Sequence, residues 1–319
     1  MVFKDIDIAH IPLEQRAYEV SFLADLTALR SSIQKRGIVQ PIQVKALPRD
    51  FNEEQFQIVS GFRRVACAQA LGMTEVSALM VDDRLSALEL FERAIEENFF
   101  SRGFNLIEKA IIVQKIEKEF GVMKEEVVQK YLPFLGLKSS ETVYQFYRAI
   151  LDLDPVLQEY SIQHCLPTHV IEEWFKFQPL DQKALIPFLH SIHFSVSTLK
   201  EFLIWIYEIS LRDHSSVSDI LLEPMQAMAQ NTALDGRQKS FIFRQWLKNK
   251  RYPLLSTLEA RFVTLKQKLH LPLEISDFFE DNKIHMKLSF QNKEELKQWL
   301  EKIKEASLKP EFDEILKIK

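Results

Sequence analysis

Glycine is scarce in this chain, and most of it lies in the N-terminal part. The 319 residues include seven glycines, where an average composition of about 7% would give roughly 22. Six lie within the first 136 residues, and Gly236 is the seventh. Because β-sandwiches and β-barrels need glycine at many turns, the long C-terminal part is predicted to be mostly helical. The sequence also lacks the glycine-rich Walker A motif.

The remaining composition is that of a globular protein. Hydrophobic residues make up 46% and charged residues 27% of the chain, which excludes a disordered polymer. The charged N-terminus does not resemble a signal peptide, and no run of 18 apolar residues predicts a membrane span. Cys67 and Cys165 have neither redox nor metal-site spacing. We therefore expect a cytoplasmic protein that does not contact membranes.

Charge does not single out any part of the chain as a polyanion-binding tail. The formal net charge is −4. Residues 1–103 carry −3, residues 104–250 carry −2 and residues 251–319 carry +1. A role in nucleic-acid binding would therefore depend on local geometry, because the bulk electrostatic attraction is missing.

The pattern of apolar and turn residues predicts an α+β protein in three parts. Residues 1–103 are expected to form a mixed α/β domain, residues 104–250 a mostly helical domain, and residues 251–319 a small α/β unit. The elements expected in the first part are helices over 23–35, 62–71 and 87–100, and strands over 41–46, 56–60 and 76–81. In the last part, strict alternation over 284–290 predicts a half-buried strand.

Residues 60–64, Ser-Gly-Phe-Arg-Arg, lie at a predicted junction of strand, turn and helix. A helix N-terminus offers free N–H groups and a partial positive charge. Gly61 lets a ligand approach the backbone, and Arg63 and Arg64 add two guanidinium groups. This combination is suited to binding phosphate. Two solvated arginines beside a turn glycine are an equally good interpretation of these residues alone.

A second group of residues lies near the end of the helix over 87–100. On a helical wheel, Asn98 falls near the centre of the apolar face, Glu97 falls at its edge, and Glu96 points to the opposite side. Glu97 and Asn98 offer the oxygen ligands that Mg²⁺ prefers, particularly when phosphates complete the site. By themselves, these residues are also explained as solvated glutamates followed by an amide at the helix end.

Residues 124–151 are a candidate helix-turn-helix. One helix is expected over 124–132, and a second is expected to begin after Ser139 or Ser140. The DNA-reading side chains of such a unit would be Lys138, Ser139, Tyr144, Gln145 and Arg148, with the last three exposed on the second helix. Residues 104–175 contain seven basic and eleven acidic residues. A structural helical hairpin therefore remains an equal alternative.

Taken in order, three motifs resemble those of the ParB partition-protein superfamily, with the similar region running from about residue 10 to 175. Residues 37–42 match a G-[IVL]-x-Q-P-I segment. Residues 61–66 match a G-E-R-R segment with one departure, since Phe62 replaces the glutamate. Glu97, Asn98 and Arg102 match an E-N-x-x-R segment with one inserted residue. The resemblance implies a ParB/sulfiredoxin-like N-terminal fold.

The resemblance also implies a function. Nucleotide and phosphate binding, to CTP in the family, would fall to Gln40, Ser60, Gly61, Arg63, Arg64 and Arg102. Glu97 and Asn98 would bind Mg²⁺. The implied partners are DNA, read by a helix-turn-helix on the nucleoid, a second copy of the chain, through residues 251–319, and a partition ATPase.

The departure at Phe62 leaves other functions open. In the family, the glutamate at this position is linked to nucleotide hydrolysis, so CTPase activity is expected to be weak or absent. A ParB-fold phosphotransferase or nuclease is one alternative, although no catalytic residue for it can be named. A protein-interaction scaffold with a degenerate pocket that does not bind DNA is the other.

Overall fold

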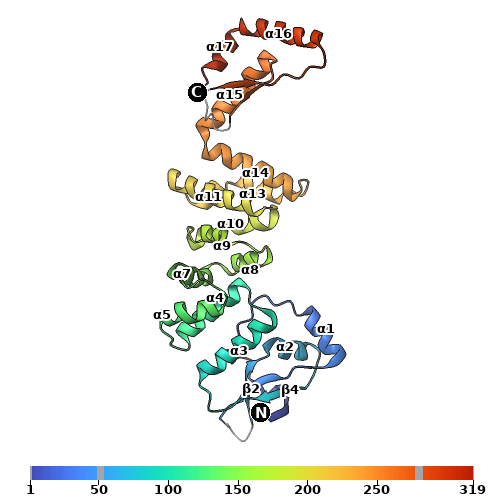
Figure 1. Ribbon diagram of the computed structural model, residues 1–319, viewed down its shortest axis with the longest axis vertical. Helices are drawn as coiled ribbons and strands as arrows, with labels where there is room; N and C mark the ends of the chain where they lie inside the picture. The colour runs from blue at the N-terminus through green and yellow to red at the C-terminus, as the bar shows by residue number, and fades with distance from the viewer. Residues whose placement is uncertain (1, 49–53, 277–282, 319) are drawn as a thin grey trace. The chain divides into compact units, whose positions relative to one another are not determined.

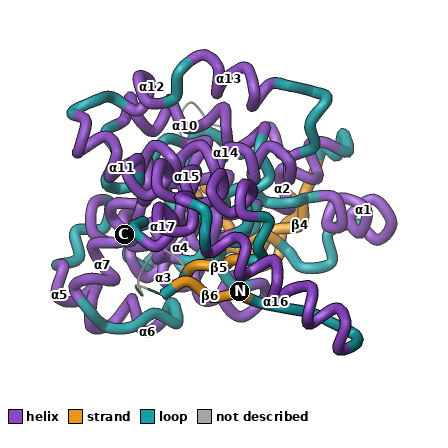
Figure 2. Tube along the Cα trace, turned by 90° about the horizontal axis from the view of Figure 1, so that it is seen from above, coloured by secondary structure: helices purple, strands orange, loops and turns teal. Residues whose placement is uncertain are grey.

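A computed structural model describes residues 2–48, 54–276 and 283–318, in two compact units, Met1–Gln182 and Lys183–Lys319 (Figure 1). The predicted α+β class is confirmed: among the described residues, strands form one four-stranded sheet in the first unit and one pair in the second (Figure 2). The three-part division into residues 1–103, 104–250 and 251–319 stays a prediction. No described helix is long and apolar enough to span a membrane.

The sheet of the first unit contains one strand that the sequence pattern did not reveal. The strands are β1 (Val2–Asp7), β2 (Ile42–Ala46), β3 (Phe56–Ser60) and β4 (Glu75–Met80), in the order β1-β4-β2-β3. β1 runs antiparallel to β4, β4 parallel to β2, and β2 antiparallel to β3. Only β1 was missed; the other three lie within a residue or two of their expected positions.

Three helices accompany this sheet: α1 (Thr27–Arg36), α2 (Phe62–Ala70) and α3 (Ala87–Arg102). The helix expected from residue 23 begins four residues later, because Leu23 has a φ of 48° that does not fit a right-handed helix. α3 begins at a complete capping box between Ser86 and Glu89. Val65 and Ala68 of α2 pack on the sheet, in a core with Ile42, Val44, Phe56, Ile58, Val76 and Ala78.

Short helices complete the first unit: η1 (Ile8–His10), α4 (Leu106–Lys118), α5 (Lys124–Glu126), η2 (Val127–Tyr131), α6 (Leu132–Phe134), α7 (Glu141–Ala149), η3 (Ile150–Asp152), α8 (Pro155–Gln163) and α9 (Thr168–Trp174). α5, η2 and α6 follow one another without a break, and η2 is a π-helical turn. Ser140 caps α7, as expected, through its hydroxyl and the N–H of Val143.

The second unit is mainly helical. Its elements are α10 (Pro179–Ser191), which begins at the end of the first unit, α11 (Val196–Asp213), α12 (Val217–Ile220), α13 (Glu223–Gln230), α14 (Gly236–Arg251), α15 (Pro253–Leu269), β5 (Leu273–Ile275), β6 (Ile284–Met286), α16 (Lys293–Ser307) and α17 (Pro310–Leu316). Two ion pairs seven residues apart, Arg244–Glu201 and Arg251–Glu208, join α14 to α11. This spacing indicates that the two helices run in the same direction.

The C-terminal elements share a small core of their own. β5 and β6 pair antiparallel, and Phe262, Leu265 and Leu269 of α15 pack with Leu273, Ala306 and Ile315. The strand expected over 284–290 ends at Met286. Alternation alone did not predict this length, because β5 supplies pairing partners only up to Leu273.

Two long helices of the second unit end without glycine. His214 caps α11 and His270 caps α15 in the left-handed conformation, with φ values of 49° and 53°. In the first unit, Gly37 and Gly103 have positive φ at the ends of α1 and α3. The scarcity of glycine after residue 136 thus reflects a use of histidine at left-handed helix ends as well as the high helix content.

Candidate functional site

The predicted phosphate-binding residues lie where β3 leads into α2. Ser60 ends β3, and Gly61 makes the turn with a φ of 109°. A side chain at Gly61 would place its Cβ 2.7 Å from Cγ2 and 2.9 Å from Cβ of Ile42 on the neighbouring strand. Both the backbone conformation and this close approach therefore require glycine.

The N-terminus of α2 opens into a pocket of about 170 Å³. α2 has no side-chain cap, so the N–H groups of Phe62 and Arg63 keep their capacity to bind an anion, whereas that of Arg64 donates to the carbonyl oxygen of Gly61. The lining residues are Tyr18, Val20, Ser21, Leu29, Gln40, Val59, Ser60, Gly61, Phe62, Arg63, Arg64, Glu97, Asn98, Ser101 and Arg102. The structure thus brings together all eight residues predicted for nucleotide and metal binding.

Two of the three pocket arginines are held by one buried carboxylate. Glu108 is 1% exposed and accepts hydrogen bonds from Nη2 of Arg63 at 2.5 Å and Nη1 of Arg102 at 2.8 Å. Burial lowers the pKa of Arg63, and repulsion by Arg102 lowers it further, against the attraction of Glu108. Arg102 thus lies close enough to Arg63 to disfavour the charge of Arg63.

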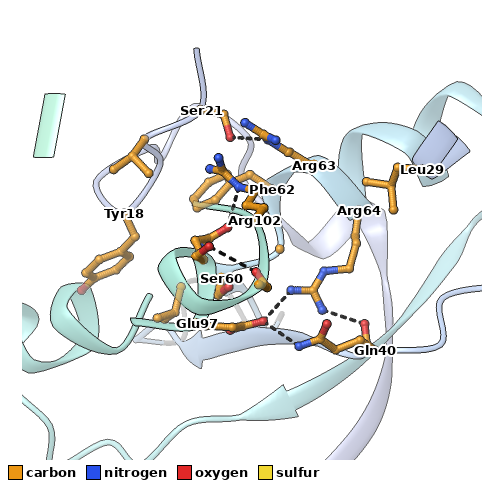
Figure 3. Close-up of a pocket in the computed structure, with 15 residues that line it drawn as sticks. Tyr18, Ser21, Leu29, Gln40, Ser60, Phe62, Arg63, Arg64, Glu97 and Arg102 are labelled. Carbon is orange, nitrogen blue, oxygen red and sulfur yellow. Dashed lines mark hydrogen bonds and ion pairs between the residues drawn. The ribbon is translucent and has the colours of Figure 1, made fainter. Parts of the chain in front are cut away.

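The third arginine is held between α3 and β2 (Figure 3). Arg64 donates from Nη2 to Oε1 of Glu97 at 2.8 Å, and from Nη1 to the carbonyl oxygens of Gln40 and Pro41. Glu97 also accepts hydrogen bonds from the side chains of Gln40 and Gln43. Both oxygens of this carboxylate are therefore occupied by donors.

Asn98 links the backbone of α3 to Arg102 rather than lying alone in the core. Its amide donates to the carbonyl oxygen of Ala94 at 2.8 Å, and its Oδ1 accepts from Nε of Arg102 at 3.2 Å. Glu97 and Asn98 have the hard oxygen donors that suit Mg²⁺. Both now face arginines, so the residues fit a magnesium ion only if phosphate oxygens take over those arginines.

Ser60 carries a buried hydroxyl that has no partner among the described residues. The residue is 2% exposed, lines the pocket, and its Oγ makes no hydrogen bond. A buried hydroxyl without a partner costs free energy, and such groups in native proteins need an explanation. An acceptor atom of a bound ligand would satisfy it.

Phe62 stands at the first position of α2 and lines the same pocket. The side chain is half-buried and packs against the core of the sheet. It carries no group that could activate water or accept a proton.

Sequence reasoning missed several residues that shape the pocket. Glu108 is the most important of them, and Ser21, which accepts a hydrogen bond from Nε of Arg63 at 3.0 Å, is another. The spacing from Asn105 to Glu108 fits a capping box, which the structure contains. That signal predicts a helix start at α4, but not the pairing with arginines from α2 and α3.

Of the three side chains expected to be exposed on the second helix for reading DNA, only that of Gln145 is fully exposed. Tyr144 is 4% exposed, which corrects the expectation of an exposed side chain, and its hydroxyl donates to Oε1 of Glu117 at 2.7 Å. Arg148 donates to the other oxygen of Glu117. Gln145 is exposed and bonds to Glu141, and Ser139 donates to the carbonyl oxygen of Val128. Lys138 is exposed in the turn before α7.

The N-terminal fold is a small α/β domain with an arginine-lined pocket. Residues 3–99 match the family model of the ParB N-terminal domain. A probable chromosome-partitioning protein ParB from Xylella fastidiosa is 32% identical over 108 residues, which cover 33% of this chain and 32% of that relative. The chromosome-partitioning protein ParB of Myxococcus xanthus is 32% identical over 102 residues, 32% of each chain.

These alignments thus span about a third of the relatives' length. Among solved structures, a C-terminally truncated ParB from Caulobacter crescentus complexed with CTP-γ-S shares 23% identity over 64% of this chain and 99% of that chain, with a TM-score of 0.27. A second, complexed to the centromeric parS site, shares 18% identity over 71% of this chain and 98% of that chain, with a TM-score of 0.32.

Proposed function

We propose that this chain binds a nucleoside triphosphate, CTP by resemblance to its family, at the N-terminus of α2 and acts as a ParB-type partition protein. One observation carries the proposal: Arg63, Arg64 and Arg102 converge on an uncapped helix N-terminus beside the unpartnered hydroxyl of Ser60. Phosphate is the ligand chemistry that satisfies all of these groups together.

In the bound state, the phosphates would take over donors that now have protein partners. The free N–H groups at the start of α2 and the three guanidinium groups would bind phosphate oxygens. Arg64 would then leave Glu97, and Arg102 would leave Asn98. Glu97 and Asn98 would hold Mg²⁺ jointly with the phosphate oxygens. When bound, the ion would supply positive charge to the phosphates.

Hydrolysis of the bound nucleotide is proposed to be slow or absent. The position after Gly61 is occupied by Phe62, which packs into the core and offers no general base. We expect nucleotide binding without phosphate release above the uncatalysed background.

The proposal predicts a specific loss of binding when Arg64 is replaced. Calorimetric titration of the full chain with CTP and Mg²⁺ is expected to show saturable binding, and Arg64→Gln is expected to weaken it about tenfold or more, because a charge-assisted hydrogen bond to phosphate is lost. Arg64 is a better test than Arg63, whose removal would leave the buried carboxylate of Glu108 partly unpaired.

A matched control is Arg84→Gln. Arg84 is exposed and pairs with Asp82 in a loop outside the pocket, so this variant is expected to bind nucleotide like the unmodified chain. Absence of binding at millimolar CTP, or equal binding by both variants, would contradict the proposed function. A panel of the other nucleoside triphosphates tests the preference for cytosine.

The partners proposed with this function are DNA, a second copy of the chain and a partition ATPase. The engagement of Tyr144 and Arg148 with Glu117 favours a second candidate, a scaffold whose helical region binds protein rather than DNA. A gel-shift titration with salt separates the two. Phosphate contacts predict an affinity for DNA that falls steeply as salt rises, whereas a scaffold gives no shift.

A further inference from the structure

A second pocket of the first unit lies against α3 and takes no part in the site described above. Its lining consists of Glu92, Ile95 and Glu96 from α3, and of Lys130, Tyr131 and Phe134 from η2 and α6. The volume is about 200 Å³. It shares no lining residue with the arginine-lined pocket.

The π-helical turn η2 shapes one wall of this pocket. Lys130 and Tyr131 are consecutive in sequence, yet both reach the same carboxylate oxygen of Glu92, each at 2.7 Å. Neighbouring residues of a regular helix point about 100° apart, and the wider π turn relaxes this restriction. Such turns inside helices are frequent at functional sites.

The floor of the pocket is apolar. Ile95 is 2% exposed, and Phe134 is half-buried with its ring 5.4 Å from that of Phe99. The ring of Tyr131 closes the wall beneath the ammonium group of Lys130. Aliphatic and aromatic surfaces of this kind attract a large apolar side chain.

The rim of the pocket carries an excess of negative charge. Glu92 and Glu126 both pair with Lys130, so two carboxylates share one ammonium group. Glu96 is exposed, and within the described part of the chain no hydrogen bond or ion pair engages its carboxylate. Among the lining residues, Glu92 and Glu96 against Lys130 leave one negative charge, opposite in sign to the charge of the arginine-lined pocket.

We propose that this pocket binds a basic peptide segment of a partner protein, with a large apolar side chain on Ile95 and Phe134 and an adjacent arginine or lysine on Glu96. The apolar floor and the unpaired carboxylate beside it are satisfied together only by a ligand that carries both groups. Nucleic acid and anionic lipid are disfavoured, because their phosphates would meet the carboxylate rim.

The probe for this site is a fluorescein-labelled peptide, Gly-Arg-Leu-Arg-Gly, titrated with the full chain and followed by fluorescence anisotropy. The expected result is saturable binding that weakens as salt rises. The matched peptide Gly-Glu-Leu-Glu-Gly is expected not to bind. Glu96→Gln is expected to weaken binding of the basic peptide about fivefold, as for the loss of one partly screened ion pair.

Glu125→Gln is the control variant, because Glu125 is also an exposed glutamate but does not line the pocket. It is expected to bind the basic peptide like the unmodified chain. Equal affinity for the two peptides, equal affinity of the two variants, or no binding at millimolar peptide would overturn the proposal. Titration of Glu96→Gln with CTP separately tests the nucleotide site. If nucleotide does not bind, the peptide result still stands, because the two pockets share no lining residue.

Discussion

Charge balance at the N-terminus of α2 depends on five side chains. Arg63, Arg64 and Arg102 are opposed by Glu97 and Glu108, so one positive charge is left over. Glu108 is nearly fully buried and also caps α4, so it stabilises two arginines and a helix start at once. A ligand that draws those arginines toward itself would therefore also act on α4.

Ser60→Ala is predicted to move protein stability and nucleotide affinity in opposite directions. Removing a buried hydroxyl that has no partner is expected to leave the free energy of unfolding unchanged or to raise it by about 1 kcal/mol. The same change removes a donor to the ligand and is expected to weaken CTP binding several-fold. Urea unfolding and calorimetry measure the two effects.

The matched control is Ser161→Ala. Ser161 is also 2% exposed, but its hydroxyl donates to the carbonyl oxygen of Leu157 at 2.7 Å. This variant is expected to lose about 0.5–1.5 kcal/mol of stability and to keep its nucleotide affinity. If both variants lost stability equally, the Ser60 hydroxyl would have a partner after all.

At the scale of single residues, the sequence predicted which residues line the pocket better than it predicted which residues contact one another. Arg63, Arg64, Glu97 and Asn98 were chosen from residue type and spacing, and they do meet. Glu108 could not be found, because its role depends on packing against Arg63, which lies 45 residues earlier in the chain. Tyr144 was expected on the surface because the helical wheel shows which residues share a face, and cannot show that α4 supplies Glu117 as a partner.

Four tyrosines of the helical region have a raised pKa, and the pKa reaches about 12 in three of them. Burial raises the pKa of Tyr131, Tyr144 and Tyr147 to about 12 in each case, and hydrogen bonds to Glu92 and Glu117 add to the shift of the first two. Unfolded tyrosine titrates near 10.0. The folded state thus holds these protons more tightly than the unfolded chain does.

The first unit is therefore predicted to lose stability as the pH rises from about 10 toward about 12. Below pH 10 both states are protonated, and the stabilisation is complete. Urea unfolding at several alkaline pH values is the measurement, with tyrosinate absorbance as a second readout. Tyr144→Phe is expected to make the decline with pH shallower, and an unchanged decline in this variant would argue against the prediction.

The helix ends of the second unit offer a separate prediction. A left-handed backbone costs a residue with a Cβ about 1–2 kcal/mol, whereas glycine avoids most of this strain. Replacing His214 and His270 by glycine is expected to raise the free energy of unfolding by about 0.5–1 kcal/mol per site after the entropy of the unfolded chain is included.

Thermal unfolding monitored by circular dichroism measures this gain. Glu119→Gly is the control, because Glu119 ends α4 in the right-handed conformation and should gain nothing from glycine. A loss of stability in His214→Gly and His270→Gly would mean that the histidine side chains contribute more than their backbone strain costs.

At the scale of elements, the sequence was most successful where local signals exist. Capping boxes, glycines and apolar periodicity placed α2, α3, β2 and β3 within a few residues. β1 gave no such signal, since only Ile6 of its six residues is buried, and the strand forms because β4 offers a partner along its whole length. The π turn of η2 could not be predicted from the sequence either, because regular apolar periodicity predicts an unbroken α-helix there.

At the scale of the whole molecule, the C-terminal elements expose several apolar side chains. α16 fully buries only Ala306, while Leu300 is 57% and Phe290 is 49% exposed. Exposed apolar groups around a small core are typical of a surface that pairs with a second copy. The homodimer expected through residues 251–319 stays a prediction.

Leu300→Glu is predicted to convert a dimer into a monomer in sedimentation experiments, because it would place a charge in an apolar interface. Gln298→Glu adds the same charge at another exposed position of α16 and is expected to leave the dimer intact. A chain that sediments as a monomer without substitution, or as a dimer with Leu300→Glu, would exclude this interface.

The histidine-capped helices also matter for the chain before it folds. A residue with a Cβ samples fewer backbone conformations than glycine, so the unfolded ensemble from residue 137 onward, with Gly236 as its one glycine, is restricted from the outset. Folding this region therefore loses less backbone conformational entropy per residue than folding a chain of average glycine content. The backbone strain at His214 and His270 in the folded state is thus accompanied by fewer conformations in the unfolded chain. Refolding of the second unit begins from this smaller set of conformations.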